Sequence, residues 1–378
     1  MKKSIAFILV LAMCIGAFAT GCASGGKEDS SVIKVGLSMP LTGNMAEYGQ
    51  QFQVAAQIAR DEINANGGIH GKTLEFVEMD SQGDAQQTAD IAREFCDNAE
   101  IVAVIGDFSS SSCMAAAPIY QENALVQISP TASHADFAPM GDYIFSTVGI
   151  MSSESYFMAE KTMQKYLELE SCAALYLNSD WGVYGFDCFE EKATEIGIEI
   201  TAKELFVEGE TDFTSVLSKL RQTDPQSLVL YAQYNEAATI IKQVKQMGWD
   251  VPIVIAGASC TDQFLELCRE DAEGVVSQVP YLFDSEMAFY KSFEEKAGFP
   301  PTVFAAYMYD TVYMLAEALN HSDAEITRES VKDALMSYKD FSGIMGAIVF
   351  SEDGDIIREE LICVVENGAW VRKTDYGY

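Results

Sequence analysis

The sequence predicts an α/β protein with two lobes, each a mostly parallel sheet flanked by helices. From residue 32 onward, short runs rich in β-branched residues alternate with amphipathic segments, a pattern typical of parallel sheets covered by helices. This alternation starts again near residue 150. The chain has 378 residues, of which 49% are hydrophobic, and a chain of this size usually divides its core between two lobes.

The first series of elements begins with a strand at 32–39, a helix at 50–66 and a strand at 74–79. Val54, Ile58 and Ile63 form an apolar stripe at helical spacing. Gly67 and Gly68 end this helix, because glycine readily adopts the backbone conformation that follows a helix. The series continues with a helix at 88–96, a strand at 101–105, a helix from about 112 and a strand at 125–129.

The second series supplies the other lobe and the end of the chain. Its predicted helices lie at 153–166, 184–196, 213–221 and 237–247, and its strands at 172–177, 198–205, 228–231, 253–256 and 275–279. Three helical stretches follow at 287–296, 304–319 and 328–337. A strand pair at 347–350 and 361–365, joined by a turn at 352–355, is predicted to end the fold.

The N-terminal residues have the layout of a secretory signal: Lys2 and Lys3, an apolar stretch at 5–19, and small residues before Cys22. The apolar stretch is shorter than the roughly 20 residues of a membrane span. The Gly-Cys junction indicates a lipoprotein signal at 1–21 with lipid on Cys22, although Ala19 stands where leucine is most common, and a plain cleaved signal is the alternative. Residues 22–31 are small and polar, which predicts a flexible tether.

Charge and composition exclude several classes of protein. The chain has 24 Lys+Arg against 57 Asp+Glu, a formal charge of −33, which disfavours binding to nucleic acid or to anionic lipid. Its three histidines have no metal-ligand spacing and no G-x-S-x-G motif occurs, so we expect no metal, no cofactor and no enzymatic activity. An extracellular hydrolase is the enzymatic alternative. Of the nine cysteines, the seven beyond Cys22 have no paired spacing, and we interpret most of them as buried small hydrophobic residues.

Polar loops follow two strands that the pattern places side by side. Residues 106–112 contain four serines between a strand and a helix, and 129–133 contain two serines and Thr131 after the next strand. Ligands of open α/β sheets bind at the carboxyl ends of strands. Hydroxyls and helix-start N–H groups favour reversible binding of a carboxylate, with simple helix capping as the alternative. Trp181 and Tyr234, on loops after later strands, are candidates for the wall of an apolar ligand.

These residues resemble the leucine/isoleucine/valine-binding type of periplasmic solute-binding protein. The resemblance extends from Val32 to about Trp370 and rests on matches at 36–43, 48–49, 61–71, 106–112, 128–130 and 272–274. It implies a type I periplasmic binding fold with three hinge crossovers near Gly149, Pro280 and after Asp355. The implied lobes are 32–149 with 281–357, and 150–280 with 358–378.

The resemblance also implies a set of ligand-binding residues. The carboxylate would bind Ser110, Thr131, Ala132 and Ser133, with aromatic walls at Tyr48, Trp181, Tyr234 and Phe304. The family's acidic partner for a ligand ammonium aligns near Ser259, so Asp262, Glu236 or Asp107 would have to replace it, or the ligand is not an ordinary amino acid. The family's first-lobe disulfide is missing, since its positions fall near Ser81 and on Ser109.

We therefore expect an extracytoplasmic, lipid-anchored binding protein of a bacterial ABC importer. Its ligand would be an amino acid, branched-chain or a related small carboxylate, captured by closure of the two lobes. Its expected partners are the ABC permease and ATPase subunits and the membrane, through the N-terminal lipid, and we expect a monomer. The alternative is a sensory module whose closed form is read by a membrane receptor.

Overall fold

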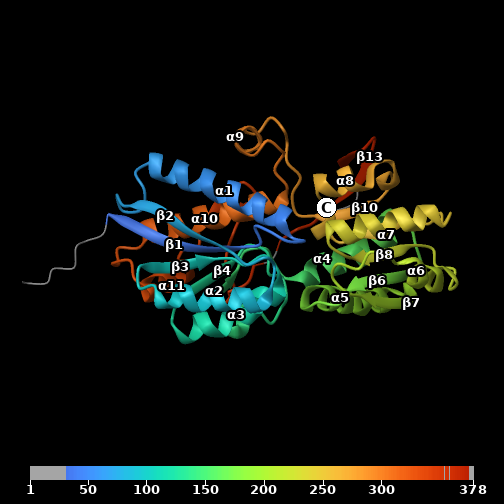
Figure 1. Ribbon diagram of the computed structural model, residues 1–378, viewed down its shortest axis with the longest axis horizontal. Helices are drawn as coiled ribbons and strands as arrows, with labels where there is room; N and C mark the ends of the chain where they lie inside the picture. The colour runs from blue at the N-terminus through green and yellow to red at the C-terminus, as the bar shows by residue number, and fades with distance from the viewer. Residues whose placement is uncertain (1–30, 353, 357, 374–378) are drawn as a thin grey trace, which may run out of the picture. The chain divides into compact units, whose positions relative to one another are not determined.

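The computed structural model describes residues 31–352, 354–356 and 358–373. Within these ranges the strands form a five-stranded sheet, a seven-stranded sheet and a separate two-stranded hairpin (Figure 1). Each of the two large sheets is the centre of one lobe, and the structure confirms the predicted α/β class. The predicted signal peptide, Cys22 and nearly all of the predicted tether lie outside the described residues.

The first sheet has the order β2-β1-β3-β4-β5, and all of its neighbouring strands are parallel. Parallel strands in the middle of such a sheet are covered on both faces, which explains their nearly continuous apolar sequences. The strands are β1 (Val32–Met39), β2 (Thr73–Asp80), β3 (Ile101–Ile105), β4 (Val126–Ser129) and β5 (Ile144–Ser146).

Helices cover both faces of this sheet. On one face, buried side chains of α1, α10 and α11 share a core with Val35, Leu37 and Ile105. On the other face, α2 and α3 pack against Ile101 and Val104. The bounds are α1 (Ala46–Ala65), α2 (Ala85–Asp97), α3 (Ser110–Glu122), α10 (Val303–His321) and α11 (Arg328–Ser337).

The second sheet has the order β14-β13-β10-β9-β8-β6-β7. Its strands are parallel from β10 to β7, whereas β13 is antiparallel to both β10 and β14. The strands are β6 (Ser171–Leu177), β7 (Glu199–Phe206), β8 (Leu228–Tyr231), β9 (Ile253–Ile255), β10 (Val276–Val279), β13 (Leu361–Glu366) and β14 (Ala369–Lys373).

Two groups of helices cover the second sheet. One face packs against α4 (Met151–Phe157), the π-helix that continues it (Met158–Tyr166) and α5 (Asp180–Ile196). The other face packs against α6 (Thr214–Arg221), α7 (Tyr234–Gln246) and α8 (Asp262–Cys268). Short 3₁₀ turns lie at Ala138–Met140, Gly257–Ser259 and Arg269–Ala272. Among the described residues, no helix combines the length and the hydropathy that a membrane span requires.

The chain passes between the two sheets three times within the described residues: after β5, after β10 and before β13. The second passage leads to α9 (Ala288–Ala297), and the third follows the hairpin of β11 (Ser342–Gly343) and β12 (Gly346–Ala347). Gly149 in the first passage has φ +99°, and a Cβ there would lie 3.4 Å from the backbone nitrogen of Arg358. The first and third passages therefore run side by side.

The predicted strand pair at the end of the fold is wrong. Residues 348–350 form no strand, and Leu361–Glu366 pairs with β10 and β14 instead. Strand β14 and the turn before it were not predicted, and in that turn Asn367 and Gly368 have φ of +54° and +76°. Two consecutive positive φ values belong to a tight hairpin turn, and Asn-Gly is its strongest sequence signal.

Candidate functional site

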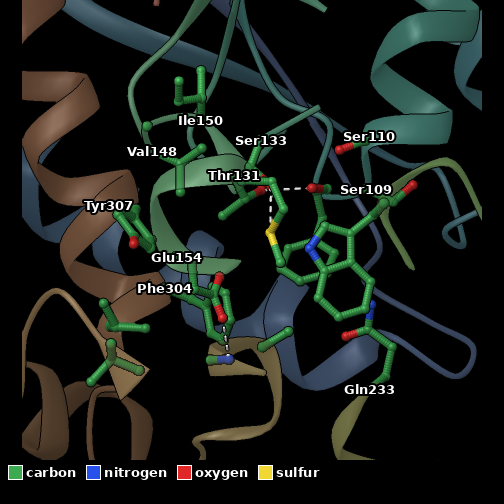
Figure 2. Close-up of a pocket in the computed structure, with 18 of the residues that line it drawn as sticks. Ser109, Ser110, Thr131, Ser133, Val148, Ile150, Glu154, Gln233, Phe304 and Tyr307 are labelled. Atoms are coloured by element: carbon green, nitrogen blue, oxygen red, sulfur yellow. Dashed lines mark hydrogen bonds between the residues drawn. The ribbon is translucent and has the colours of Figure 1, made fainter. Parts of the chain in front are cut away.

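A cavity lies between the carboxyl ends of the two sheets (Figure 2). It encloses about 130 Å³, similar to an engineered protein cavity of about 150 Å³ that holds benzene. Its wall combines residues that follow β3 and β4 with residues that follow β6, β8 and β9, and residues of all three passages complete it. This is the position at which open α/β sheets bind their ligands.

The loop after β3 carries the first group of hydroxyls. Ser109 caps α3, because its Oγ accepts a hydrogen bond from the backbone nitrogen of Ser112 at 3.1 Å. Ser110 is 1% exposed and lines the cavity, and its Oγ has no hydrogen-bond partner among the described residues. Ser111 also lines the cavity and accepts a bond from the Asp180 nitrogen of the other lobe at 3.4 Å. The buried Ser110 hydroxyl is therefore available to a ligand.

The loop after β4 lies against this first loop. Thr131 Oγ1 donates to the carbonyl oxygen of Phe108 at 2.7 Å. Ser129 Oγ accepts bonds from the backbone nitrogens of Thr131, at 3.3 Å, and Ala132, at 2.8 Å. Thr131 and Ser133 line the cavity, whereas Ala132 is fully buried and does not. Of the residues expected to bind the ligand carboxylate, the structure therefore brings Ser110, Thr131 and Ser133 together.

Aromatic side chains occupy two layers around the cavity. Trp181 and Phe304 line it directly. Tyr48 lies behind them, fully buried, with its ring stacked on Phe108 at a centroid distance of 4.1 Å. The Tyr234 hydroxyl donates to the Asn44 carbonyl oxygen across the two lobes at 3.4 Å. Two of the four expected aromatic residues thus line the cavity, and the other two lie outside its wall.

Hydrogen bonds join the lobes beside the cavity and hold it closed. The Tyr48 hydroxyl, from α1, lies 2.8 Å from Gln233 Oε1 and 3.0 Å from the Ala258 carbonyl oxygen. Asn235 Nδ2 donates to the Asn44 carbonyl oxygen at 3.1 Å. Burial raises the pKa of Tyr48 well above its usual range, so this hydroxyl keeps its proton and remains a donor.

The expected candidates for an ammonium partner lie away from the cavity. Asp107 is buried under the first loop and accepts bonds from Ser38 Oγ at 2.8 Å and the Phe108 nitrogen at 2.6 Å. Glu236 accepts the Gly209 nitrogen at 3.1 Å. Asp262 begins α8, and Ser259 is buried with its Oγ donating to Ala232. The cavity wall contains none of these four residues.

A set of charged residues that the sequence analysis missed lines the cavity near the passages between the lobes. Glu154 is in the first turn of α4, and its Oε1 accepts bonds from the Gly257 nitrogen at 2.7 Å and Gln278 Nε2 at 3.0 Å. Arg358 and Glu360 come from the segment before β13. Burial raises the pKa of both glutamates, and repulsion from Glu154 adds to the shift of Glu360.

These charged residues have no shared sequence motif, because they come from helix α4 and the last passage. Arg358 Nε and Nη2 both donate to the Thr147 carbonyl oxygen, at 3.2 and 3.0 Å, and its guanidinium lies 5.6 Å from the Tyr307 ring centroid. The described residues contain no cluster of His, Cys, Asp or Glu suited to a metal ion. The cavity wall thus combines hydroxyl donors, carboxyl groups and apolar side chains.

Comparison with known proteins gives a consistent result. A sequence profile of the periplasmic binding protein family matches residues 32–369. The Leu/Ile/Val-binding protein homolog 1 of Brucella abortus (strain 2308) is 26% identical over 343 residues, covering 90% of this chain and 91% of that protein. The leucine-, isoleucine-, valine-, threonine- and alanine-binding protein of Pseudomonas aeruginosa is 25% identical over 352 residues, covering 92% of each.

Solved structures share the fold. The branched-chain amino acid transporter substrate binding protein of Streptococcus pneumoniae, in complex with isoleucine, has a TM-score of 0.83 at 28% identity and covers 90% of this chain and 100% of its own. A solute binding protein of an ABC transporter from R. palustris, in complex with benzoate, has a TM-score of 0.82 at 20% identity and covers 90% of this chain and 95% of its own. The second likeness concerns the fold alone.

Proposed function

The chain belongs to the periplasmic binding protein family, and from this we propose that it is the extracytoplasmic solute-binding component of an ABC importer, with an amino acid as its solute. The relatives named for leucine, isoleucine and valine support an aliphatic amino acid. The observation that carries the proposal is the buried Ser110 hydroxyl, which faces the cavity between the lobes and has no partner among the described residues.

The loops after β3 and β4 would bind the ligand carboxylate. Ser110 Oγ–H is a free donor, and it lies at the start of α3, where the helix dipole favours an anion. The Ser133 hydroxyl adds a second donor, since its contact in this structure is a 3.6 Å approach to Met151 Sδ. A hydrogen bond to a charged group contributes about 1.5–3 kcal/mol, which suits reversible capture.

The apolar part of the cavity wall would hold the side chain of the ligand. Trp181 and Phe304 come from opposite lobes, and Val148, Ile150 and Met151 line the same space. Apolar walls with a few oriented polar groups are typical of small-molecule sites. An aliphatic side chain between these residues would bury surface only when both lobes contact it.

Ligand capture would therefore proceed by closure of the two lobes, which we assign to 32–149 with 281–357 and to 150–280 with 358–378. The three passages, near Gly149, Pro280 and after Asp355, would act as the hinge. In the open form the bonds of Tyr48 and Asn44 to the second lobe would be absent. The ligand and these contacts together would stabilise the closed form, which a permease would then recognise.

We also propose that Cys22 carries the lipid that attaches the protein to the membrane, with 1–21 as its signal peptide and 22–31 as its tether. Partition into Triton X-114 detergent tests this assignment. The wild-type chain should enter the detergent phase, whereas Cys22→Ser should stay in the aqueous phase. Detergent partition by Cys22→Ser would contradict the assignment.

A thermal-shift screen tests the proposed solute. The purified protein is unfolded and refolded to remove carried-over ligand, and is then heated with each amino acid and with small carboxylates. A ligand at 100 times its dissociation constant should stabilise the fold by about 2.7 kcal/mol, and we expect an aliphatic amino acid to do so. A panel in which no amino acid raises the midpoint would overturn the proposal. Uptake of the labelled amino acid by cells with and without the protein then tests the transport role.

A further inference from the structure

The cavity has a second polar end, formed by Glu154, Arg358 and Glu360 (Figure 2 labels Glu154). Glu154 belongs to α4, and the other two belong to the last passage between the lobes. All three side chains line the same cavity as Ser110 and Thr131. A ligand that fills the cavity therefore meets both hydroxyls and carboxyl groups.

The Glu154 carboxyl is held in place by one of its two oxygens. Oε1 accepts the bonds from the Gly257 nitrogen and Gln278 Nε2. Oε2 makes no hydrogen bond or ion pair among the described residues. Glu154 is thus a fixed carboxyl with one oxygen left for a donor in the cavity.

The charges around Glu154 favour a cation on the ligand. Arg358 is the one Lys, Arg or His side chain among the described residues that lines the cavity. Its donors go to the carbonyl oxygens of Thr147 and Met345, and its charge interacts with Glu360 and Asp310. The Glu154 carboxyl itself forms no ion pair with a cationic side chain among the described residues, so a cation on the ligand would be its counter-charge.

We propose that Glu154 binds the ammonium group of the ligand through Oε2, so that the ligand is a zwitterion with its carboxylate at the Ser110 end. This inference rests on the proposed function and narrows it to solutes that carry both charges. It replaces Asp262, Glu236 and Asp107 as ammonium partners, since all three lie outside the cavity wall.

The test compares two variants and two probes by isothermal calorimetry on the refolded protein. Glu154→Gln removes the charge and keeps the size, and Asp262→Asn is the matched control outside the cavity. The probes are leucine and 4-methylpentanoate, the same acid without its amino group. Glu154→Gln should weaken leucine binding on the order of 100-fold and change 4-methylpentanoate binding by less than about threefold. Asp262→Asn should change neither.

Several outcomes would overturn the inference. Unchanged leucine affinity in Glu154→Gln would overturn it. Equal losses of affinity for leucine and 4-methylpentanoate would also overturn it, because they would indicate general damage to the cavity. If Glu154→Gln does not fold, the wild-type preference decides, because leucine should bind at least about tenfold more tightly than 4-methylpentanoate. Binding of 4-methylpentanoate alone would refute Glu154 as ammonium partner, whereas failure of every amino acid would refute the proposed function itself.

Two buried cysteines of the second lobe lie close together. Cys260 precedes α8 and Cys363 lies in β13, and their Sγ atoms are 3.5 Å apart. Both side chains are buried, in a small apolar cluster with Val279. Two thiols at this distance need a shift of about 1.5 Å to reach the roughly 2.05 Å of a disulfide bond.

We infer that Cys260 and Cys363 form a disulfide when the chain folds in an oxidising compartment. The oxidant is the disulfide of a thiol oxidase. One cysteine thiolate attacks that disulfide and releases one carrier thiolate, and the second cysteine thiolate then attacks the mixed disulfide and releases the other. The protein loses two protons and two electrons, and the carrier is reduced to its dithiol. Burial raises the pKa of the Cys260 thiol and so disfavours the reactive thiolate. The bond would therefore form before the second lobe has finished folding around this pair.

Alkylation and mass spectrometry test the pair. Protein secreted by cells is denatured and treated with iodoacetamide, with or without prior reduction. The reduced sample should carry two more alkyl groups, both on Cys260 and Cys363, while buried Cys268 should be alkylated in both samples. In Cys260→Ser, the remaining Cys363 should react without reduction. Full alkylation of Cys260 and Cys363 in the unreduced wild-type protein would refute the disulfide.

Discussion

The two polar ends of the cavity are held in place by different means. At the hydroxyl end, Ser109 and Ser129 bond to backbone nitrogens within three residues of themselves. At the acidic end, Glu154 depends on Gly257 and Gln278, which are more than one hundred residues away along the chain. The first end is built from local turns and the second from the tertiary fold.

Because of this difference, substitutions at the two ends should affect ligand binding and the stability of the apo-protein to different extents. A free hydroxyl such as that of Ser110 adds little to the fold, so its removal should affect the ligand alone. The acidic end places like charges near one another in a buried position, and such charges destabilise the fold unless Arg358 compensates them. Substitutions there should change the stability of the apo-protein as well as ligand binding.

The largest effect is expected from Arg358→Met. The substitution removes both donors to the Thr147 carbonyl oxygen and leaves Glu360 and Asp310 without the guanidinium. We expect the free energy of unfolding in urea to fall by roughly 3–5 kcal/mol. Arg372→Met, at an exposed position of β14, is the control and should stay within about 0.5 kcal/mol of the wild type. An equally small change in Arg358→Met would remove the contrast between the two ends.

A carboxyl outside the cavity tests whether burial of acid alone destabilises the fold. Glu47 of α1 faces Asp262 and Glu266 of α8, and burial raises its pKa to about 8. The unfolded carboxyl has a pKa of about 4.3, so the native state binds the extra proton and stability falls as pH rises between these values. Glu47→Gln should therefore be more stable than the wild type at pH 8, by about 4 kcal/mol, and similar to it near pH 4.5.

Urea unfolding at several pH values from 4.5 to 9 measures this effect. Glu199→Gln, on the exposed start of β7, is the control and should follow the pH dependence of the wild type. Parallel curves for Glu47→Gln and the wild type would show that Glu47 titrates normally in the folded protein.

A substitution at the hydroxyl end should lower ligand affinity without lowering the stability of the apo-protein. Ser110→Ala removes a donor to the ligand carboxylate but no internal hydrogen bond, so affinity for the amino acid should fall about tenfold while apo stability stays unchanged or rises slightly. Calorimetry and urea unfolding give the two numbers. Ser218→Ala, which removes an exposed hydroxyl of α6, should leave affinity unchanged. A loss of stability in Ser110→Ala without loss of affinity would reverse the assignment.

The smallest effect is expected at the contact between the lobes. Tyr48→Phe keeps the ring on Phe108 but removes the hydroxyl that reaches Gln233 and Ala258. One neutral hydrogen bond contributes about 1 kcal/mol, so affinity should fall roughly fivefold if that bond forms on closure. Tyr338→Phe, whose hydroxyl bonds to Glu317 within the first lobe, is the control. Equal affinities in both variants would show that the contact is present in the open form too.

The sequence predicted the fold class and the hydroxyl end because both depend on local patterns. Strand and helix periodicity is readable over ten residues, and the serines of 106–112 follow directly on β3. It did not predict Glu154 or Glu360, because single glutamates on a helix and on a connecting segment give no local signal. The wrong pairing predicted for 361–365 could have been avoided from the sequence, because Asn367-Gly368 is the signal of a hairpin that leads to β14.

The place of β13 in the second sheet has a consequence for biosynthesis. β10 ends at Val279, and its neighbour β13 begins at Leu361. A chain synthesised from its N-terminus therefore exposes an unpaired β10 edge until residues 361–366 have been made, and such edges invite aggregation. Folding of the second lobe should thus depend on chaperones that shield this edge, and a nonsense mutation that removes β13 and β14 should yield no soluble product.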